Sequence, residues 1–167
     1  MYPISVGILW PRDYFVGFQP TISLVTMNFL WFEDMALPSE IENRTATTLM
    51  TFINLPAVFT FKLPHSKLHL SAGVGINIRY SFLSLGVDKT DPGFNGNTAQ
   101  EDVKLINKWF WEYGHWLYLT AGTSWLYPIT DKIQVGPVFD VKIPMGLLID
   151  EKNVQGMMLS VGFKLCI

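Results

Sequence analysis

Apolar and polar residues alternate without interruption along residues 67–82, KLHLSAGVGINIRYSF. The apolar set starts at Leu68 and ends at Phe82, whereas the intervening set is polar or small and includes Arg79. Successive side chains on a β-strand point to opposite faces, so the pattern predicts one strand with a fully apolar face. Helical spacing would instead distribute these apolar residues around the axis. At about 3.3 Å per residue, the strand would be much longer than the usual soluble strand of about 5–6 residues.

The same alternation recurs along most of the chain and predicts further strands. Residues 103–113, VKLINKWFWEY, fit either a strand or a short helix at a barrel rim. Pro56 cannot donate to a sheet ladder, so we expect a bulge or a local irregularity there. The predicted strands are residues 2–10, 21–33, 47–63, 67–82, 115–127, 132–147 and 156–167, and the predicted connections are 11–20, 34–46, 64–66, 85–102, 128–131 and 150–153.

Hairpins join these strands, because no crossover helix is predicted between them. Uninterrupted antiparallel hairpins are typical of an up-and-down meander that closes into a barrel. Residues 1–167 are therefore predicted to form a single all-β domain, an antiparallel up-and-down barrel of about eight strands. The alternation is imperfect along residues 21–33, TISLVTMNFLWFE, where apolar residues occur on both faces.

The two faces of residues 67–82, 132–147 and 156–167 differ sharply in composition. The apolar face carries no charged residue, whereas the other face carries cations, Asp140 and several glycines. Glycine weakens a strand on a solvated surface, and it is expected where space is short, as inside a narrow barrel. We therefore predict a transmembrane barrel with the apolar face toward lipid and the polar face toward the lumen.

The face assignment gives two sets of candidate site residues. Arg79, Asp140, Lys142 and Lys164 are expected to form a paired network, which would reduce the cost of burying their charges. The predicted lumen-facing residues are Lys67, His69, Asn77, Arg79, Gln134, Asp140, Lys142 and Lys164, and the predicted lipid-facing residues are Leu70, Val74, Ile76, Ile78, Val135, Phe139, Val141, Leu159, Val161 and Phe163.

Aromatic residues gather near the ends of the predicted strands. Amphipathic rings at strand ends are typical of the two interfacial girdles of a membrane barrel, although aromatic residues also favour strands in general. The girdle interpretation rests on Trp10, Trp31, Phe32, Tyr80, Phe82, Trp125 and Tyr127, with residues 109–111 at the start of a turn region.

The composition agrees with an alternating barrel. The chain is 49% hydrophobic and 16% charged, whereas an average soluble domain carries about 25% charged residues. No run approaches the roughly 18 consecutive apolar residues of a membrane-spanning helix. The net charge is −2 with no basic patch, so we expect no nucleic-acid partner.

The two ends of the chain raise separate points. The first residues, MYPISVGILWPRD, lack a basic region before the apolar run, so they do not resemble a signal peptide. A leader or a first strand has been removed, or the protein is not exported. The single cysteine, Cys166, excludes an internal disulfide and is expected to have a packing role.

The last strand resembles that of bacterial outer-membrane barrels, because apolar residues occupy every second position from Leu159 to Ile167. The usual final residue of that family is Phe, where this chain has Ile167. The whole chain resembles small eight-stranded proteins of the OmpW/OmpX type and, more narrowly, a group of uncharacterised spirochaetal barrel proteins, through residues 42–46, 72–82 and 106–111. The resemblance implies location in the bacterial outer membrane and recognition of the last strand by the barrel-assembly machinery.

The sequence offers little catalytic chemistry. His65 and His69 can share a strand face near Ser66, but the sequence places no carboxylate to orient either ring. His115 stands apart, and no zinc pattern, phosphate-binding glycine loop or nucleophile elbow is present. We expect no enzymatic activity, no metal and no cofactor, with His65 in a turn and His69 in the lumen.

The sequence therefore predicts an integral outer-membrane protein surrounded by lipid. Its expected role is structural or adhesive, through the loop at 85–102, or transport of a small hydrophobic molecule, as in OmpW-like proteins. The alternative is a soluble lipocalin-like barrel that binds a hydrophobic ligand with its apolar face inward. The glycine-rich polar face argues against this alternative, and the missing leader argues for it.

Overall fold

The computed structural model describes the chain except for residues 1–2, 11–13, 41–44, 94–95, 113 and 149–156. Nine strands among the described residues form one antiparallel sheet, and one α-helix interrupts their sequence order. The elements are β1 (Ile4–Gly7), β2 (Val16–Phe18), β3 (Thr21–Phe32), β4 (Met35–Pro38), β5 (Ala46–Leu63), β6 (Ser66–Leu83), α1 (Ala99–Trp111), β7 (Leu117–Pro128), β8 (Gln134–Pro144), the 3₁₀ helix η1 (Met145–Leu148) and β9 (Met158–Cys166).

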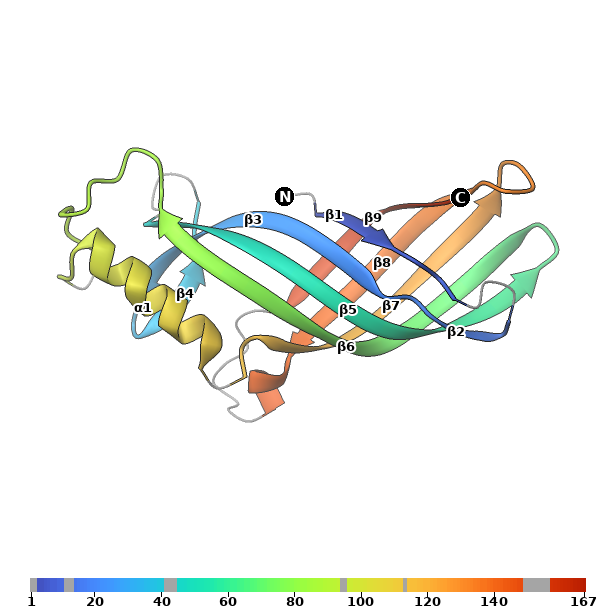
Figure 1. Ribbon diagram of the computed structural model, residues 1–167, viewed down its shortest axis with the longest axis horizontal. Coiled ribbons are helices and arrows are strands. Elements are labelled where there is room, and N and C mark those ends of the chain that lie inside the picture. The colour runs from blue at the N-terminus through green and yellow to red at the C-terminus, as the bar shows by residue number, and fades with distance from the viewer. Residues whose placement is uncertain (1–2, 11–13, 41–44, 94–95, 113, 149–156) are drawn as a thin grey trace.

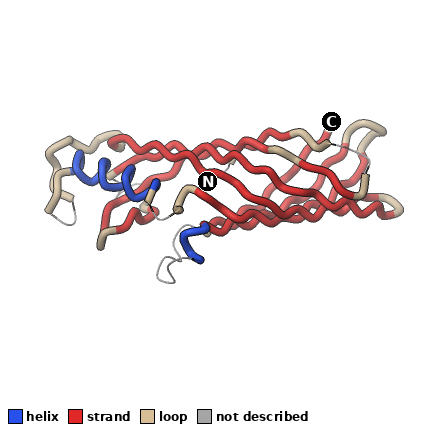
Figure 2. The backbone as a smooth tube through the Cα atoms, turned by 60° about the horizontal axis from the view of Figure 1, so that its bottom comes forward, coloured by secondary structure: helices blue, strands red, loops and turns tan. Residues whose placement is uncertain are grey.

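The sheet curls strongly, like one half of a barrel (Figures 1 and 2). Neighbouring strands follow the order β1-β3-β5-β6-β7-β8-β9, and every neighbouring pair is antiparallel. Within the described residues no ladder joins β1 to β9, so the sheet is open along this seam. The hairpin meander is confirmed, whereas the closed barrel and the crossing of a membrane remain predictions.

The edge of the sheet near the N-terminus contains two short strands that the sequence analysis missed. β2 lies within the predicted connection 11–20. It is in line with β3, and both strands pair with β5 in the same register. β4 lies within the predicted loop 34–46 and pairs with the end of β3, on the side where β1 pairs with its start. Glu33 and Asp34 form the turn before β4 with φ values of 48° and 60°, as a tight two-residue hairpin requires.

Pro56 lies in the middle of β5 without a bulge. The register of β5 against β6 is unbroken along both strands, so the predicted bulge is wrong. The irregularity lies in the neighbouring strand, where β2 and β3 are interrupted at Gln19 and Pro20 opposite Pro56. The Gln19 amide still donates to the Pro56 carbonyl oxygen at 3.0 Å, so the interruption does not separate the strands.

Two predicted boundaries are wrong at their C-terminal ends. The strand predicted at 132–147 ends as β8 at Pro144 and continues into η1. The loop predicted at 85–102 ends earlier, because α1 begins at Ala99. The turn predicted at 150–153 lies outside the described residues.

Helix α1 begins at a capping box. The Thr98 hydroxyl accepts a hydrogen bond from the Glu101 amide at 3.4 Å, and the Glu101 carboxylate accepts from the Thr98 amide at 2.8 Å. The Thr98 amide and the Thr98 hydroxyl both donate to the Glu101 carboxylate at 2.8 Å, and these two hydrogen bonds hold the pKa of the Glu101 carboxyl below its usual range. The segment predicted as either a strand or a short helix, residues 103–113, is therefore helical as far as Trp111. No helix among the described residues is long and apolar enough to cross a membrane.

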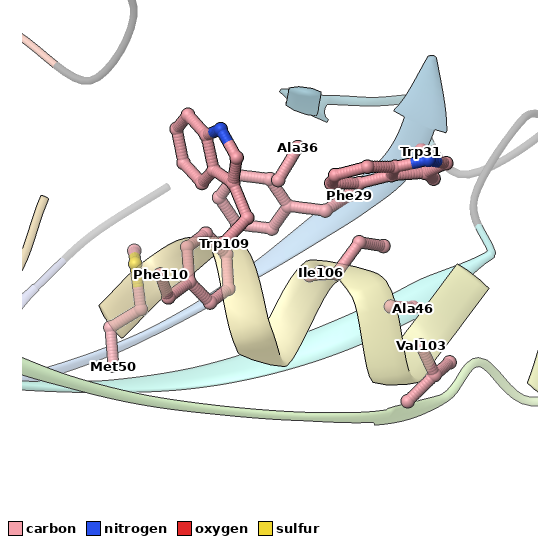
Figure 3. Close-up of a cluster of buried hydrophobic side chains, with 9 residues drawn as sticks. All are labelled: Phe29, Trp31, Ala36, Ala46, Met50, Val103, Ile106, Trp109 and Phe110. Atoms are coloured by element: carbon pink, nitrogen blue, oxygen red, sulfur yellow. The ribbon is translucent and has the colours of Figure 1, made fainter. Parts of the chain in front are cut away.

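The main hydrophobic cluster lies where α1 packs against one end of the sheet (Figure 3). The rings of Phe29 on β3 and Phe110 on α1 meet edge to face, with centroids 5.0 Å apart. Trp31 is also buried in this cluster, so its assignment to an interfacial girdle is wrong. Trp109 is buried there as part of α1 rather than at the start of a turn region. The cluster explains why residues 21–33 are apolar on both faces, because one face of β3 contacts the helix. The buried members are Phe29, Trp31, Ala36, Ala46, Met50, Val103, Ile106, Trp109 and Phe110.

Helix α1 also covers part of a strand edge. β7 pairs with β6 only as far as Ile76, so the following residues of β6 lack a strand neighbour on that side. The Asn107 side chain takes the place of a neighbouring strand. Its Oδ1 accepts from the Ser81 amide at 2.8 Å, and its Nδ2 donates to the Ser81 carbonyl at 2.9 Å. This pair of hydrogen bonds satisfies backbone groups that an exposed edge would leave open.

Two glycines on neighbouring strands offer a matched test of close packing. A Cβ at Gly136 of β8 would overlap the carbonyl oxygen of Trp125 on β7, whereas a Cβ at Gly162 of β9 would lie an ordinary 3.7 Å from Val138. We expect Gly136→Ala to lower the free energy of unfolding by about 1–3 kcal/mol, the usual cost of overpacking. Gly162→Ala should be neutral or slightly stabilising. Denaturant titrations of both variants measure the difference, and equal effects would contradict it.

Candidate functional site

The side chains of β6 divide into a buried polar set and an exposed apolar set. His69, Asn77 and Arg79 are 4%, 1% and 4% exposed, whereas Val74 and Ile76 are 50% and 41% exposed. This distribution is the reverse of that in a soluble protein, where the apolar side of a strand is buried. The candidate site is therefore the polar side of the sheet.

Contacts between distant strands show that this polar side is concave. The Lys142 ammonium on β8 lies 5.2 Å from the centre of the Phe52 ring on β5, although β6 and β7 separate these strands in the sheet. The Lys164 ammonium on β9 donates to the Gln19 carbonyl oxygen Oε1 at 2.7 Å. Such contacts require the sheet to curl around them, so these side chains occupy its inner side.

Most of the predicted lumen-facing residues are more buried than the predicted lipid-facing residues. Their assignment to a lumen and to lipid remains a prediction. Among the predicted lumen-facing residues, His69, Asn77 and Arg79 are buried, and Lys67, Gln134, Asp140, Lys142 and Lys164 are partly buried. Among the predicted lipid-facing residues, Leu70, Val74, Ile76, Ile78, Phe139, Leu159, Val161 and Phe163 are exposed, and Val135 and Val141 are partly buried.

Asp140 lies in a row of residues across three strands. Ser71 of β6 is opposite Gly122 of β7, which is opposite Asp140 of β8. A Cβ at Gly122 would overlap the Asp140 carboxylate and would lie 2.9 Å from the Ser71 hydroxyl oxygen. The missing side chain at residue 122 therefore makes room for the carboxylate on the inner side.

The expected network of Arg79, Asp140, Lys142 and Lys164 does not form. Among the described residues, no ion pair joins Asp140 to any of the three cations. Arg79 belongs to a separate cluster near α1, because its guanidinium donates to the Tyr118 hydroxyl at 3.0 Å and to the His115 carbonyl. The guanidinium carbon also lies 4.2 Å from the centre of the Phe110 ring, within the range of a cation–π contact.

His115 completes the cluster near α1. Its ring stacks on Trp109 with a centroid separation of 3.9 Å, and its Nδ1 lies 2.8 Å from the Trp109 carbonyl oxygen. A carbonyl oxygen only accepts, so Nδ1 carries the proton. Burial lowers the pKa of His115 below its usual range. The neutral His115 ring therefore holds the C-terminal end of α1 in place beside Arg79.

The structure assembles no hydrolytic or metal-binding arrangement among the described residues. The Ser66 hydroxyl accepts a hydrogen bond from the Trp125 indole at 2.9 Å, and no hydrogen bond joins Ser66 to His65 or His69. His65 lies in the exposed turn between β5 and β6, and His69 points to the concave side. No group of three or more His, Cys, Asp or Glu side chains is arranged to hold a metal ion in this part of the chain.

Comparison of the chain with models of protein families, with curated proteins and with solved structures finds no match.

Sequence reasoning missed the residues that connect the helix to the concave side. Tyr118 was not among the predicted site residues, yet it is fully buried and its ring centre lies 4.9 Å from that of Phe52. Trp109 and Phe110 are adjacent in sequence, but both contact the sheet. The available signal was the position of Ile106, three residues before Trp109 and four before Phe110. This spacing indicates that the three apolar residues share one face of a helix.

Proposed function

We propose that the protein is an integral outer-membrane β-barrel, with no enzymatic activity, whose convex side contacts lipid and whose concave side lines a lumen. The observation that carries the proposal is the exposed apolar surface of consecutive strands. Val74, Leu119 and Phe139, on β6, β7 and β8, are 50%, 38% and 41% exposed. The polar side chains of the same strands are buried or partly buried. This arrangement matches the alternation of membrane barrels, apolar outward and polar inward.

Energetics support lipid as the surroundings of the convex side. Full burial of a Val, Leu, Ile or Phe side chain is worth about 1.5–3 kcal/mol relative to exposure to water. Contiguous apolar patches on soluble monomers rarely exceed a few hundred Å², and larger ones mark contact with a membrane or a partner. Exposed large apolar residues occur on all of the long strands, β3 and β5 to β9. The pattern therefore favours the membrane barrel over the soluble lipocalin-like alternative.

Exposed aromatic residues lie toward both ends of the long strands. Trp125 and Tyr127 stack with centroids 5.9 Å apart, beside the short turn before β8. Tyr80 and Phe82 are exposed at the opposite end, where β6 leads toward α1. Rings at both strand ends match the positions of the two interfacial girdles of a membrane barrel.

Within this proposal we favour a structural or adhesive role over transport. The apolar inner residues of β3, which could otherwise line a path for a hydrophobic molecule, pack against α1 instead. Helix α1, Phe110 and Arg79 occupy one end of the concave side, where a permeating molecule would have to pass. The long connection at residues 84–98 is then the surface available for binding.

Refolding with and without detergent tests the proposal. We expect the urea-denatured chain to regain β-structure on dilution into micelles, because micelles cover the convex apolar side. Heated and unheated samples should then migrate differently on a gel, and circular dichroism should show no comparable folding in plain buffer. Folding to the same β-structure in buffer alone would overturn the proposal and support the soluble barrel.

A further inference from the structure

The two open edges of the sheet run in the same direction. Every pair along β1-β3-β5-β6-β7-β8-β9 is antiparallel, so strand direction reverses at each of six steps and returns to that of β1 at β9. Direct closure of β1 on β9 would therefore form a parallel pair. One additional strand between them, running in the opposite direction, would be antiparallel to both.

Among the described residues, both edge strands are apolar and have a strand neighbour on one side only. Val6 of β1 and Val161 of β9 are 73% and 79% exposed, well above the 50% of Val74 in the interior of the sheet. An open strand edge is not tolerated in lipid, because its backbone amides and carbonyls have no water to bond. If the chain spans a membrane, the seam requires a partner strand.

The charges of the strands indicate what the missing strand carries. The nine described strands contain one acidic residue, Asp140, against five basic residues: Lys62, Lys67, Arg79, Lys142 and Lys164. Lys164 lies on the edge strand β9 and points to the concave side, where it donates one of its three N–H groups to Gln19. An inward-facing carboxylate on the next strand would be a cross-strand neighbour of Lys164 and would offset the excess positive charge.

We infer that the seam between β1 and β9 is filled by one amphipathic β-strand of a partner polypeptide, which runs antiparallel to both edges and directs a carboxylate toward Lys164. The inference rests on the proposed membrane function, because the sheet must be closed only if it spans a membrane. A second copy of the chain does not meet the same need. Two copies embedded in one membrane with the same orientation would bring β9 against the partner's β1, again in parallel.

A pair of synthetic peptides tests the inference. The chain refolded in zwitterionic micelles is titrated with peptides of about 10 residues, the length of a membrane strand. Both peptides alternate Val with Ser or Thr, and they differ only in a central inward residue, Glu or Lys. We expect the Glu peptide to protect the seam-facing amides of β1 and β9 from hydrogen exchange and to bind about tenfold more tightly than the Lys peptide, because like charges repel across an interface.

Substitution of Lys164 provides the charge control. Lys164→Glu should reverse the preference so that the Lys peptide binds more tightly, and Lys164→Arg should keep the original preference. Equal binding of both peptides to the parent chain, or seam-facing amides of β1 and β9 that are protected before any peptide is added, would overturn the inference. Failure to fold in micelles would instead overturn the proposed membrane function before a peptide is added.

Cysteine pairs test direct closure. In a Cys166→Ser background, Ile8→Cys is combined in turn with cysteine at residue 161, 163 or 165. A disulfide needs Cα atoms about 4.4–6.8 Å apart, whereas strands separated by one other lie about 9–10 Å apart. We expect no disulfide until a spacer reagent is used, and the pair Phe139→Cys with Val161→Cys should oxidise readily because these residues are opposite each other. A direct disulfide from residue 8 would overturn the inference.

Discussion

Val74→Lys should lower the free energy of unfolding in micelles by about 2–4 kcal/mol. Val74 lies in the middle of β6 on the convex side, half exposed and opposite Leu55 of β5 and Leu119 of β7, which are also exposed. A lysine there would place its charge among lipid tails if the convex side faces a membrane. Denaturant titration of the micelle-folded variant, followed by circular dichroism, measures the loss.

Ser160→Lys is the matched control for this substitution. Ser160 points to the concave side of β9, directly opposite Asp140 on β8. An opposite-charge pair between facing strands contributes about 0.2–1 kcal/mol, so we expect the same added charge to be neutral or slightly stabilising. If both lysines cost the same, or if Val74→Lys costs nothing, the convex side does not face lipid.

Phe110→Ala should release α1 from the sheet, at a local cost of about 3–5 kcal/mol. The Phe110 side chain is 1% exposed, and its ring contacts Phe29 and lies under the Arg79 guanidinium. Its removal leaves a cavity in the hydrophobic cluster and exposes part of a buried cation. Amide hydrogen exchange should accelerate in α1 by more than a hundredfold, because each 1.4 kcal/mol corresponds to a factor of ten.

Trp111→Ala provides the comparison on the same helix, because Trp111 is 50% exposed. This variant should leave exchange in α1 close to that of the parent chain. Exchange in β7 and β8 should stay slow in both variants, since the ladders of these strands do not involve Phe110. If Phe110→Ala also unfolds β7 and β8, then α1 is part of the cooperative core rather than a separately docked element.

The long strands were predictable because their information is local. Alternation along residues 67–82 specifies both the extended conformation and the face of each side chain, and β6 spans Ser66–Leu83. The turn before it, at Pro64 and His65, was equally readable. By contrast, the predicted end of β8 and the predicted start of α1 were wrong. Pro144 ends β8 and the capping box at Thr98 begins α1, and both signals act over only a few residues within longer patterns.

The cluster around Arg79 was beyond sequence reasoning. The sequence placed Arg79 on the polar face of its strand and predicted a network that pairs it with Asp140. The structure pairs it with Tyr118 and Phe110, because the register of β6 against β7 and the position of α1 decide which side chains meet. Such contacts depend on residues more than thirty positions apart, and no periodicity within one strand reports them.

The sequence alone determined the mostly β class, the hairpin order of the long strands and the division of their side chains into a polar and an apolar set. These properties follow from a two-residue period that each strand carries by itself. Only the tertiary structure decided which set is buried, because that depends on the direction in which the whole sheet curls. It also decided that residues 99–111 form a helix, whose apolar side is matched by the inner residues of β3.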